Sequence, residues 1–411
     1  MNTSAVYLDH AATTDLNPAA LAAITEQYSR TGNPSSLHGA GRSANRVVDE
    51  SRQAVAIAAG AHPSELIFTS GGTESDNLAI KGLFWNRVAA NDQARTIALT
   101  GIEHHAVLDT AMWLEEHENA TLLWLPVDGD GVIDLAAAAT LFAEHHQKIA
   151  LATLMWANNE VGTVQPVAAF ARLAAGYGIP VHSDAVQAFG AVEVDFANSN
   201  LATMAISAHK IGGPVGIGGL LVRRDIVLTP VQHGGGHERK LRSGTLNAAS
   251  AAGFAAAATA VRAHLKDEAT RLSQLREYAV QRITELVPEA QFNGPRDAGN
   301  EGTRLPGNLH FTFPECEGDS LLFLLDMVGI ASSTGSACTA GVPQPSHVLL
   351  AMGRDARSAR SVQRFTLGHT STRADVDALI EALPQAYARA KKAGMAADES
   401  SIHTAGTGFT R

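Results

Sequence analysis

Residues 149–184 read IALATLMWANNEVGTVQPVAAFARLAAGYGIPVHSD, and this stretch decides the fold class. Its two ends, 149–156 and 178–184, are short apolar runs of the kind that form buried strands. Between them, PVAAFARLAAGYG repeats apolar residues at helical spacing, with a proline suited to the first turn and glycines suited to the exit. A strand, a helix and a second strand in this order predict two parallel strands joined by a helical crossover.

The same alternation extends on both sides, from about residue 65 to residue 225. Further buried strands are expected at ELIFTS (65–70), TIALTG (96–101), TMAISAH (203–209) and GIGGLLVR (216–223). We therefore expect an α/β large domain over 15–262 with a mainly parallel sheet, and a smaller α+β domain made of 1–14 and 263–393. Residues 394–411 lack apolar periodicity and are expected to form a disordered tail.

The composition narrows the possible functions. The chain has 411 residues and a net charge of −10, which argues against a protein whose main work is direct nucleic-acid binding. No secretory signal is visible, and no apolar stretch is long enough to cross a bilayer, so we expect no membrane association and a cytoplasmic location. In that compartment the two cysteines are better explained as free thiols than as a disulfide.

A glycine-rich turn follows the first expected strand, in SGGTESDN (70–77). Gly72 permits close approach of the backbone, Thr73 adds a hydroxyl, and the helix that follows points unpaired N–H groups at the turn. The stretch predicts a phosphate cradle. By itself it is equally typical of an ordinary strand-to-helix turn that Thr73 caps.

Two charged residues follow neighbouring expected strands. Lys210 comes after TMAISAH, where burial can make a lysine an amine nucleophile, although a lone lysine at a strand end is more often a solvated charge. Asp184 ends the strand before it, with Gln187 three residues later. A carboxylate there can pair with the protonated ring nitrogen of pyridoxal phosphate. The cradle, Asp184 and Lys210 together therefore match the phosphate, ring nitrogen and aldehyde of that cofactor.

Two further loops fit the same pocket. His104 follows the strand near 96–101 and could stack on the ring and relay protons, and Asn159 follows the strand near 149–156. An ordinary surface or core role for His104 stays open. No metal site is expected, because H-E-x-x-H is absent and HGGGHE (233–238) has glycines where a ligand helix needs helix formers. In the same loop, Arg242 and Thr245 could reach an anionic group.

The two cysteines differ in their surroundings. Cys316 has acidic neighbours that raise a thiol pKa, so we expect it to be inert. Cys338 lies in SSTGSACTAG (332–341) among small residues that offer no apolar anchor, so we expect its loop to move. An accidental exposed thiol is the alternative for Cys338.

Taken together, the motifs resemble those of a group I cysteine desulfurase, a class V aminotransferase-type pyridoxal-phosphate enzyme with the aspartate-aminotransferase-like fold (fold type I). The resemblance runs from about residue 5 to residue 390, and SAHK and SSTGSAC are its most specific segments. The segments that carry it are YLDHAATT (7–14), GNPSSLH (32–38), SGGTESDN (70–77), EHHAVLD (103–109), NNEVGTVQP (158–166), HSDAVQAFG (182–190), SAHKIGGPVGIGGL (207–220), GGGHERKLRSGT (234–245), SSTGSACTAGVPQPSHVL (332–349) and RFTLGHTS (364–371).

The resemblance implies a role for each matching residue. Lys210 would bind the cofactor covalently, Asp184 its ring nitrogen and Gln187 its phenolic oxygen, while His104 would stack on the ring. The phosphate would be bound by Gly72, Thr73, Ser207 and His209, with Thr245 from the second subunit of a homodimer. Asn159 and Arg364 would hold the carboxylate of L-cysteine. Cys338 would take the sulfur as a persulfide and leave L-alanine.

The resemblance also implies a biological role and leaves alternatives. The sulfur would pass to an acceptor protein such as an iron–sulfur scaffold, or to other acceptors. His369 stands where the family often has arginine. An aminotransferase or a selenocysteine lyase of the same superfamily, and a catalytically silent scaffold, are the alternatives at this point.

Overall fold

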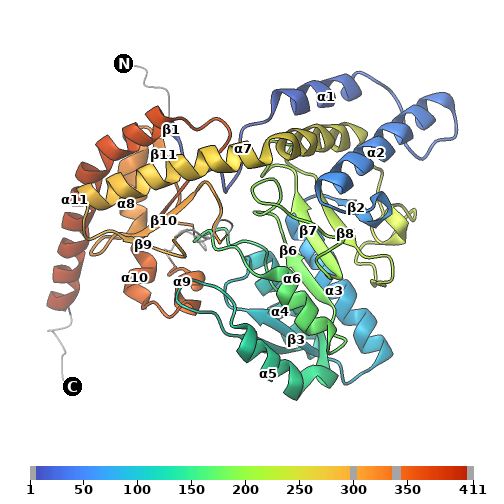
Figure 1. The fold of residues 1–411 in the computed structure, drawn as a ribbon, viewed down its shortest axis with the longest axis horizontal. Coiled ribbons are helices and arrows are strands. Elements are labelled where there is room, and N and C mark those ends of the chain that lie inside the picture. Colours follow the sequence, from blue (N-terminus) through green and yellow to red (C-terminus); the bar gives the residue numbers. More distant parts are fainter. Residues whose placement is uncertain (1–5, 297–302, 336–343, 405–411) are drawn as a thin grey trace.

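The computed structural model describes residues 6–296, 303–335 and 344–404, with side chains up to residue 393. At its centre is a seven-stranded sheet (Figure 1). The strands stand side by side in the order β2 (Leu66–Thr69), β8 (Gly218–Val222), β7 (Thr203–Ser207), β6 (Val181–Asp184), β5 (Ile149–Thr153), β3 (Thr96–Thr100) and β4 (Thr121–Leu125). The expected α/β architecture is therefore present.

One strand departs from the expected parallel arrangement. Strand β8 is antiparallel to both of its neighbours, β2 and β7. Only ten residues, 208–217, join β7 to β8, and they form turns instead of a helix. A connection without a crossover helix returns the chain in the opposite direction. The sheet is therefore mixed: strands β3 to β7 pair in parallel, whereas β8 pairs antiparallel with β7 and with the edge strand β2.

Helices cover both faces of this sheet, because successive side chains of each strand point to opposite faces. On one face, α3 (Gly72–Ala90) and α4 (His105–Glu118) pack in a core that includes Ile67. On the other face, the core includes Phe68 and is closed by α2 (Gly39–Ala58), α5 (Leu135–His145), α6 (Val167–Ala175) and the start of α7 (Ala248–Leu286). Helix α1 (Pro18–Tyr28) packs against α7, and the short 3-10 turns are η1 (Pro63–Glu65), η2 (His146–Lys148) and η3 (Glu238–Lys240).

A smaller lobe carries its own sheet and core. Antiparallel strands β9 (Gln291–Phe292), β10 (Asn308–Thr312) and β12 (Val362–Thr366) pack beneath α8 (Gly318–Asp326), α11 (Arg373–Thr404) and the second half of α7. The N-terminal strand β1 (Val6–Tyr7) joins this lobe by pairing with β11 (Ile330–Ala331). Helices α9 (His347–Ala351) and α10 (Ala356–Arg360) form a separate apolar cluster that includes Ile102 of the large lobe.

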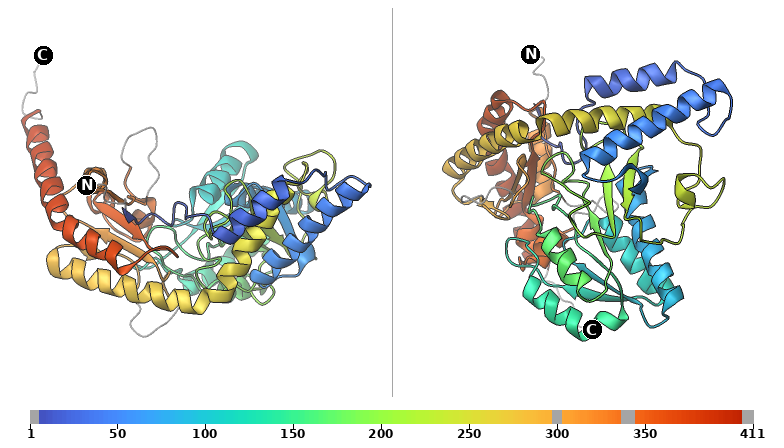
Figure 2. Two further views of the ribbon diagram at one scale, coloured as in Figure 1. Left: turned by 90° about the horizontal axis from the view of Figure 1, so that it is seen from above. Right: turned by 45° about the vertical axis from the view of Figure 1, so that its right-hand side comes forward.

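The long helix α7 links the two lobes (Figure 2). It runs unbroken through residues 262 and 263, where the sequence places the domain boundary, so that boundary stays a prediction. Helix α11 continues to Thr404, so the backbone of 394–404 is helical in this structure, and the disordered tail expected over 394–411 stays a prediction. The stretch AGMAADE (393–399) explains the helix, because it is rich in strong helix formers. Residues 405–411 lie outside the described part of the chain.

A glycine in β8 allows the turn after β2 to approach the sheet closely. A Cβ atom added at Gly218 would lie 2.7 Å from the Cα of Gly71 and from the carbonyl oxygen of Ile206. We predict that Gly218→Ala lowers the free energy of unfolding by about 1–3 kcal/mol, because backbone must move to admit the methyl group. Urea denaturation measures the change. Gly129→Ala is the control, since a Cβ there meets no atom within 4 Å, and an equal loss in both variants contradicts the explanation.

Candidate active site

A cavity of about 270 Å³ lies at the carboxyl ends of the central strands, next to the small lobe. The ends of parallel strands lie along one edge of a sheet, which explains why residues far apart in the sequence meet here. The lining includes ten residues that the sequence singled out: Gly72, Thr73, His104, Asn159, Asp184, Gln187, Ser207, His209, Lys210 and Arg364. Their assembly in one cavity is a finding, whereas their individual roles stay predictions.

Asp184 ends β6 and is buried. Its carboxylate accepts a hydrogen bond from the backbone N–H of Val186 at 2.9 Å. Burial raises the pKa of Asp184, while the nearby His104 and Lys210 act in the opposite direction. A buried carboxylate of this kind strongly stabilises a cation placed beside it, such as a protonated ring nitrogen.

Asp76 and His182 form a buried pair near Asp184 that the sequence analysis did not identify. The Nε2 atom of His182 lies 3.1 Å from Oδ1 of Asp76, and Nδ1 lies 2.9 Å from Oγ1 of Thr203. Burial raises the pKa of Asp76 and lowers the pKa of His182 to about 3. Both shifts favour the neutral forms of the two side chains. A signal for Asp76 existed, since it follows Gly72 by four residues and so lies on the same face of α3.

Glu103, directly before His104, is a second buried carboxyl that the sequence analysis missed. Its Oε1 accepts hydrogen bonds from Thr100 Oγ1 at 2.9 Å and from the N–H of Met155 at 3.1 Å. Burial raises its pKa to about 8, so the carboxyl is mostly protonated at neutral pH. Only tertiary structure shows this, because a glutamate in a loop is ordinarily exposed.

Lys210 lies three residues beyond β7 and turns toward the N-terminal segment. Its Nζ donates to the carbonyl oxygens of Ala11 and, at 2.8 Å, of Ala12. Burial, and then the charge of Arg364, lower the pKa of Lys210 to about 8. A lysine with such a pKa is partly neutral near pH 8, and the neutral amine is the nucleophilic form.

His104 is held in a defined orientation at the start of α4. Its Nδ1 accepts a hydrogen bond from the N–H of Ala106 at 3.1 Å, so the proton of the neutral ring is on Nε2. Burial lowers the pKa of His104, and the nearby Lys210 adds to this. A neutral imidazole in this position can carry a proton through Nε2.

The N-terminus of α3 supplies unpaired donors to the cavity. No side chain caps this helix, and Gly72 and Thr73 occupy its first turn. Ser207 ends β7, and His209 follows with its Nδ1 3.3 Å from Thr13 Oγ1. Burial and Lys210 lower the pKa of His209 to about 4, which makes it a neutral hydrogen-bonding group. Uncapped N–H groups at the positive end of a helix fit a phosphate, as the sequence predicts.

Arg364 reaches the cavity from β12 of the small lobe. Its Nη1 donates to the carbonyl oxygen of Asn159 and its Nη2 to Oδ1 of Asp9, both at 2.8 Å. Its Nε has no hydrogen-bond partner among the described residues. Asp9 was not singled out from the sequence, although it lies in the motif YLDHAATT. An arginine held on two sides in this way is oriented to receive a carboxylate.

The remaining predicted residues lie apart from this group or outside the described residues. Gln187 lines the cavity and donates from Nε2 to the carbonyl oxygen of Ala11 at 2.9 Å. Thr245 is exposed and does not line the cavity.

Of the two cysteines, Cys338 lies outside the described residues, although Gly335, three positions earlier, lines the cavity. Cys316 is buried, and its pKa is raised to about 12 by burial and by Glu317, in keeping with an inert thiol.

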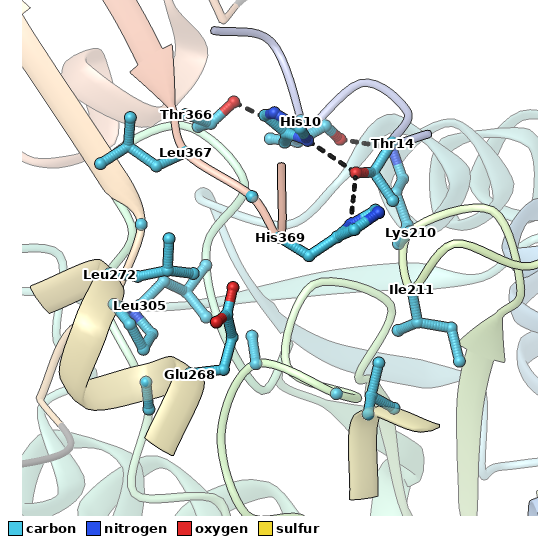
Figure 3. A pocket seen from close by; sticks show the side chains of 18 of the residues that line it. His10, Thr14, Lys210, Ile211, Glu268, Leu272, Leu305, Thr366, Leu367 and His369 are labelled. Atoms are coloured by element: carbon cyan, nitrogen blue, oxygen red, sulfur yellow. Dashed lines mark hydrogen bonds between the residues drawn. The ribbon is translucent and has the colours of Figure 1, made fainter. Parts of the chain in front are cut away.

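A second, mostly apolar cavity of about 320 Å³ shares Ala11, Gln187 and Lys210 with the first (Figure 3). His369 lines it and not the first cavity, and lies 3.5 Å from Oγ1 of Thr14. We assign the chemistry to the smaller cavity, because it collects the buried titratable residues and the uncapped helix end.

Two classes of feature were searched for over the described residues. Within 6–296, 303–335 and 344–404, no group of three or more histidine, cysteine or acidic side chains is arranged to hold a metal ion. In the same part of the chain, no helix has the length and apolar character needed to cross a membrane.

Comparisons with known proteins identify the family to which this chain belongs. A model of the aminotransferase class-V family matches residues 6–379. An IscS-like cysteine desulfurase of Mycobacterium tuberculosis (strain ATCC 25618 / H37Rv) is 52% identical over 391 residues, covering 95% of this chain and 98% of the relative. A solved NifS-like protein is similar with a TM-score of 0.82 at 34% identity, covering 93% of this chain and 98% of that chain.

Another solved structure, described as SspA in complex with cysteine, has a TM-score of 0.73 at 32% identity, covering 88% of this chain and 98% of that chain. The uncapped helix end, the buried Asp184 and the amine of Lys210 fit the phosphate, ring nitrogen and aldehyde of pyridoxal 5'-phosphate. The chain therefore belongs to the aminotransferase class-V family and, within it, to the group I cysteine desulfurases, which use that cofactor.

Proposed function

We propose that this enzyme removes sulfur from L-cysteine, leaves L-alanine and carries the sulfur as a persulfide on Cys338. One observation carries the proposal: the uncapped end of α3, Asp184 and Lys210 meet in a cavity that Gly335 also lines. Cys338 follows Gly335 by three residues, a chain length that spans at most about 11 Å. This chain length is short enough for the thiol of Cys338 to meet a substrate bound in this cavity, as the proposal requires.

The residues of the large lobe would hold the cofactor. Gly72 and Thr73 would bind its phosphate with Ser207 and His209, and Lys210 would bind it covalently. Asp184 would keep its ring nitrogen protonated, because a buried carboxylate favours a neighbouring cation. When bound, pyridoxal phosphate supplies an electron sink that weakens bonds to the substrate carbons.

Residues from both lobes would hold and process the substrate. Arg364 would bind the carboxylate of L-cysteine beside Asn159, with Asp9 keeping the guanidinium oriented. His104 would hold or deliver a proton through Nε2. The thiolate of Cys338 would attack the substrate sulfur, so that a sulfur–sulfur bond forms as the carbon–sulfur bond breaks.

Partners and location are part of the same proposal. We expect a homodimer, in which the exposed Thr245 of each chain reaches the phosphate site of the other. The acceptor of the persulfide sulfur is expected to be a protein such as an iron–sulfur scaffold. A cytoplasmic location stays a prediction of the sequence. We also expect no direct nucleic-acid binding, because the net charge of −10 disfavours contact with a phosphate backbone.

The alternatives are less well supported. An aminotransferase or selenocysteine lyase would share the cofactor residues, but two of the relatives reported above are described as an IscS-like cysteine desulfurase and a NifS-like protein. A silent scaffold would have no need for Lys210 to be held buried with a lowered pKa. Desulfuration of L-cysteine therefore accounts for more of the site than either alternative.

The lowered pKa of Lys210 predicts how cofactor uptake depends on pH. Because the neutral amine reacts, the rate at which the apoprotein gains visible cofactor absorbance should rise about fivefold from pH 7 to 8 and less than twofold from pH 8 to 9. An amine of ordinary pKa would instead give about a tenfold rise per unit throughout that range. Stopped-flow absorbance measures the profile. Lys210→Ala is the control and should gain no such absorbance.

The persulfide step can be tested on Cys338 directly. After brief exposure to L-cysteine without reductant, mass spectrometry should find one added sulfur on the peptide that contains Cys338. Cys338→Ala should keep the visible cofactor absorbance and lose at least about a hundredfold in sulfide release with a reductant, because the attacking thiolate is gone. Cys316→Ala is the matched control and should keep full activity. Undiminished sulfide release by Cys338→Ala would exclude the mechanism.

A further inference from the structure

The segment 234–245 folds back on itself beside the edge strand β2. At η3, three consecutive residues that are not glycine, Glu238, Arg239 and Lys240, have φ angles of 46°, 57° and 64°. This left-handed region is unfavourable for residues with a side chain. Three such residues in a row persist only where surrounding contacts determine the backbone.

Glu238 supplies the main contacts. Its side chain is only 1% exposed and forms a two-pronged ion pair with Arg52, with one N···O distance of 2.8 Å and the other of 2.5 Å. Glu238 also accepts a hydrogen bond from the N–H of Phe68 at 2.6 Å, and Arg52 donates to the carbonyl oxygen of Leu66 at 2.8 Å. Strand β2 is at the edge of the sheet and has no neighbouring strand on this side. The ion pair therefore provides hydrogen-bond partners for the N–H of Phe68 and the carbonyl oxygen of Leu66.

Arg242 attaches the same segment to the other side of the phosphate cradle. Its Nε donates to Oε1 of Glu74 at 2.8 Å, and Oε2 of Glu74 accepts from the N–H of Ser70 at 2.7 Å. Segment 234–245 therefore contacts the chain just before the cradle, at Phe68 in β2, and just after it, at Glu74 in α3. The turn that carries Gly72 lies between these two contacts.

The charge of Glu74 has a consequence for any phosphate bound there. Burial raises the pKa of Glu74, but hydrogen bonds from Arg242 and Ser70 outweigh this and hold the pKa below its usual range. Glu74 is therefore ionised in the first turn of α3. A carboxylate at a helix N-terminus stabilises the helix, but here it also repels an anion that binds to the same N–H groups. Arg242 offsets that repulsion.

We propose that Glu238 and Arg242 are positioning residues for the phosphate of the cofactor. Glu238 holds the segment on β2, and Arg242 neutralises Glu74 beside the cradle. Neither residue needs to touch the phosphate. The inference rests on the proposed function, in which Gly72 and Thr73 bind that phosphate.

A comparison of two ligands isolates the phosphate. The dissociation constants of pyridoxal phosphate and of pyridoxal, which lacks the phosphate, are measured on the full-length apoprotein by absorbance and fluorescence titration. Arg242→Gln should raise the dissociation constant of pyridoxal phosphate three- to tenfold and that of pyridoxal less than about twofold. Only the phosphate is repelled by the Glu74 carboxylate once Arg242 no longer neutralises it. The loss should shrink as salt is raised.

A second substitution separates an offset charge from a direct contact. Glu74→Gln added to Arg242→Gln should restore most of the affinity for pyridoxal phosphate, because the repelling carboxylate is also removed. No recovery would show that Arg242 acts some other way and would overturn its role here. Arg223→Gln is the matched control. Arg223 also pairs with a carboxylate, that of Asp225, but it follows the C-terminal end of β8, whereas Gly218, which contacts the cradle, begins the strand. This control should bind both ligands normally.

Glu238 needs a variant that leaves no buried charge unpaired. Arg52→Met combined with Glu238→Gln removes both charges, which preserves folding better than either change alone. Thermal unfolding of the apoprotein checks that the variant is folded. The double variant should raise the dissociation constant of pyridoxal phosphate several-fold more than that of pyridoxal. An equal effect on both ligands would overturn the positioning role of Glu238.

Thr73→Ala distinguishes failure of this inference from failure of the proposed function. If Thr73→Ala weakens both ligands equally, the phosphate does not bind at the cradle and the proposed function fails there. If Thr73→Ala is selective for the phosphate and Arg242→Gln is not, only the positioning role of Arg242 fails.

Discussion

Burial of the Asp184 carboxylate is the electrostatic constraint on which the rest of the cavity depends. A buried charge is costly unless neighbouring groups stabilise it. His104 and Lys210 oppose the effect of burial on Asp184, whereas burial drives Asp76 and Glu103 toward the protonated state. Burial thus raises the pKa of all three nearby carboxyls, but His104 and Lys210 counteract this at the one that ends β6. A cationic ring beside Asp184 completes this balance, which explains why the site suits pyridoxal phosphate.

The second organising feature is the contact between the lobes. Arg364 belongs to the small lobe, yet it binds the carbonyl oxygen of Asn159 in the large lobe. The backbone of Arg364 pairs with that of Ser333, so the strand that holds the arginine also supports the chain leading to Gly335. Under the proposed function, the residue that binds the substrate carboxylate and the segment that leads to Cys338 are therefore joined in the small lobe through this pairing. Any movement of β12 relative to the large lobe would affect both.

Contacts from other parts of the chain hold the flexible, glycine-containing turn between β2 and α3, which forms the phosphate cradle. Gly218 admits the turn after β2 to within contact of the sheet. Segment 234–245 then holds the chain on both sides of it through Glu238 and Arg242. The strain of three left-handed residues is the cost of routing the segment across this edge. The motif GGGHERKLRSGT thus contacts both sides of the cradle of its own chain, while its Thr245 is exposed.

Local sequence patterns predict the α/β class, the positions of six strands of the central sheet and the cavity residues that follow them. They do so because periodicity and strand-end chemistry are local properties of the chain. Only the folded chain shows the antiparallel direction of β8, the buried pair of Asp76 and His182, and the raised pKa of Glu103. These depend on burial and on contacts between residues distant in sequence, which no local pattern encodes. The same reason explains why Glu238, an ordinary charged residue in a loop motif, becomes visible as a buried partner of Arg52 only in the folded chain.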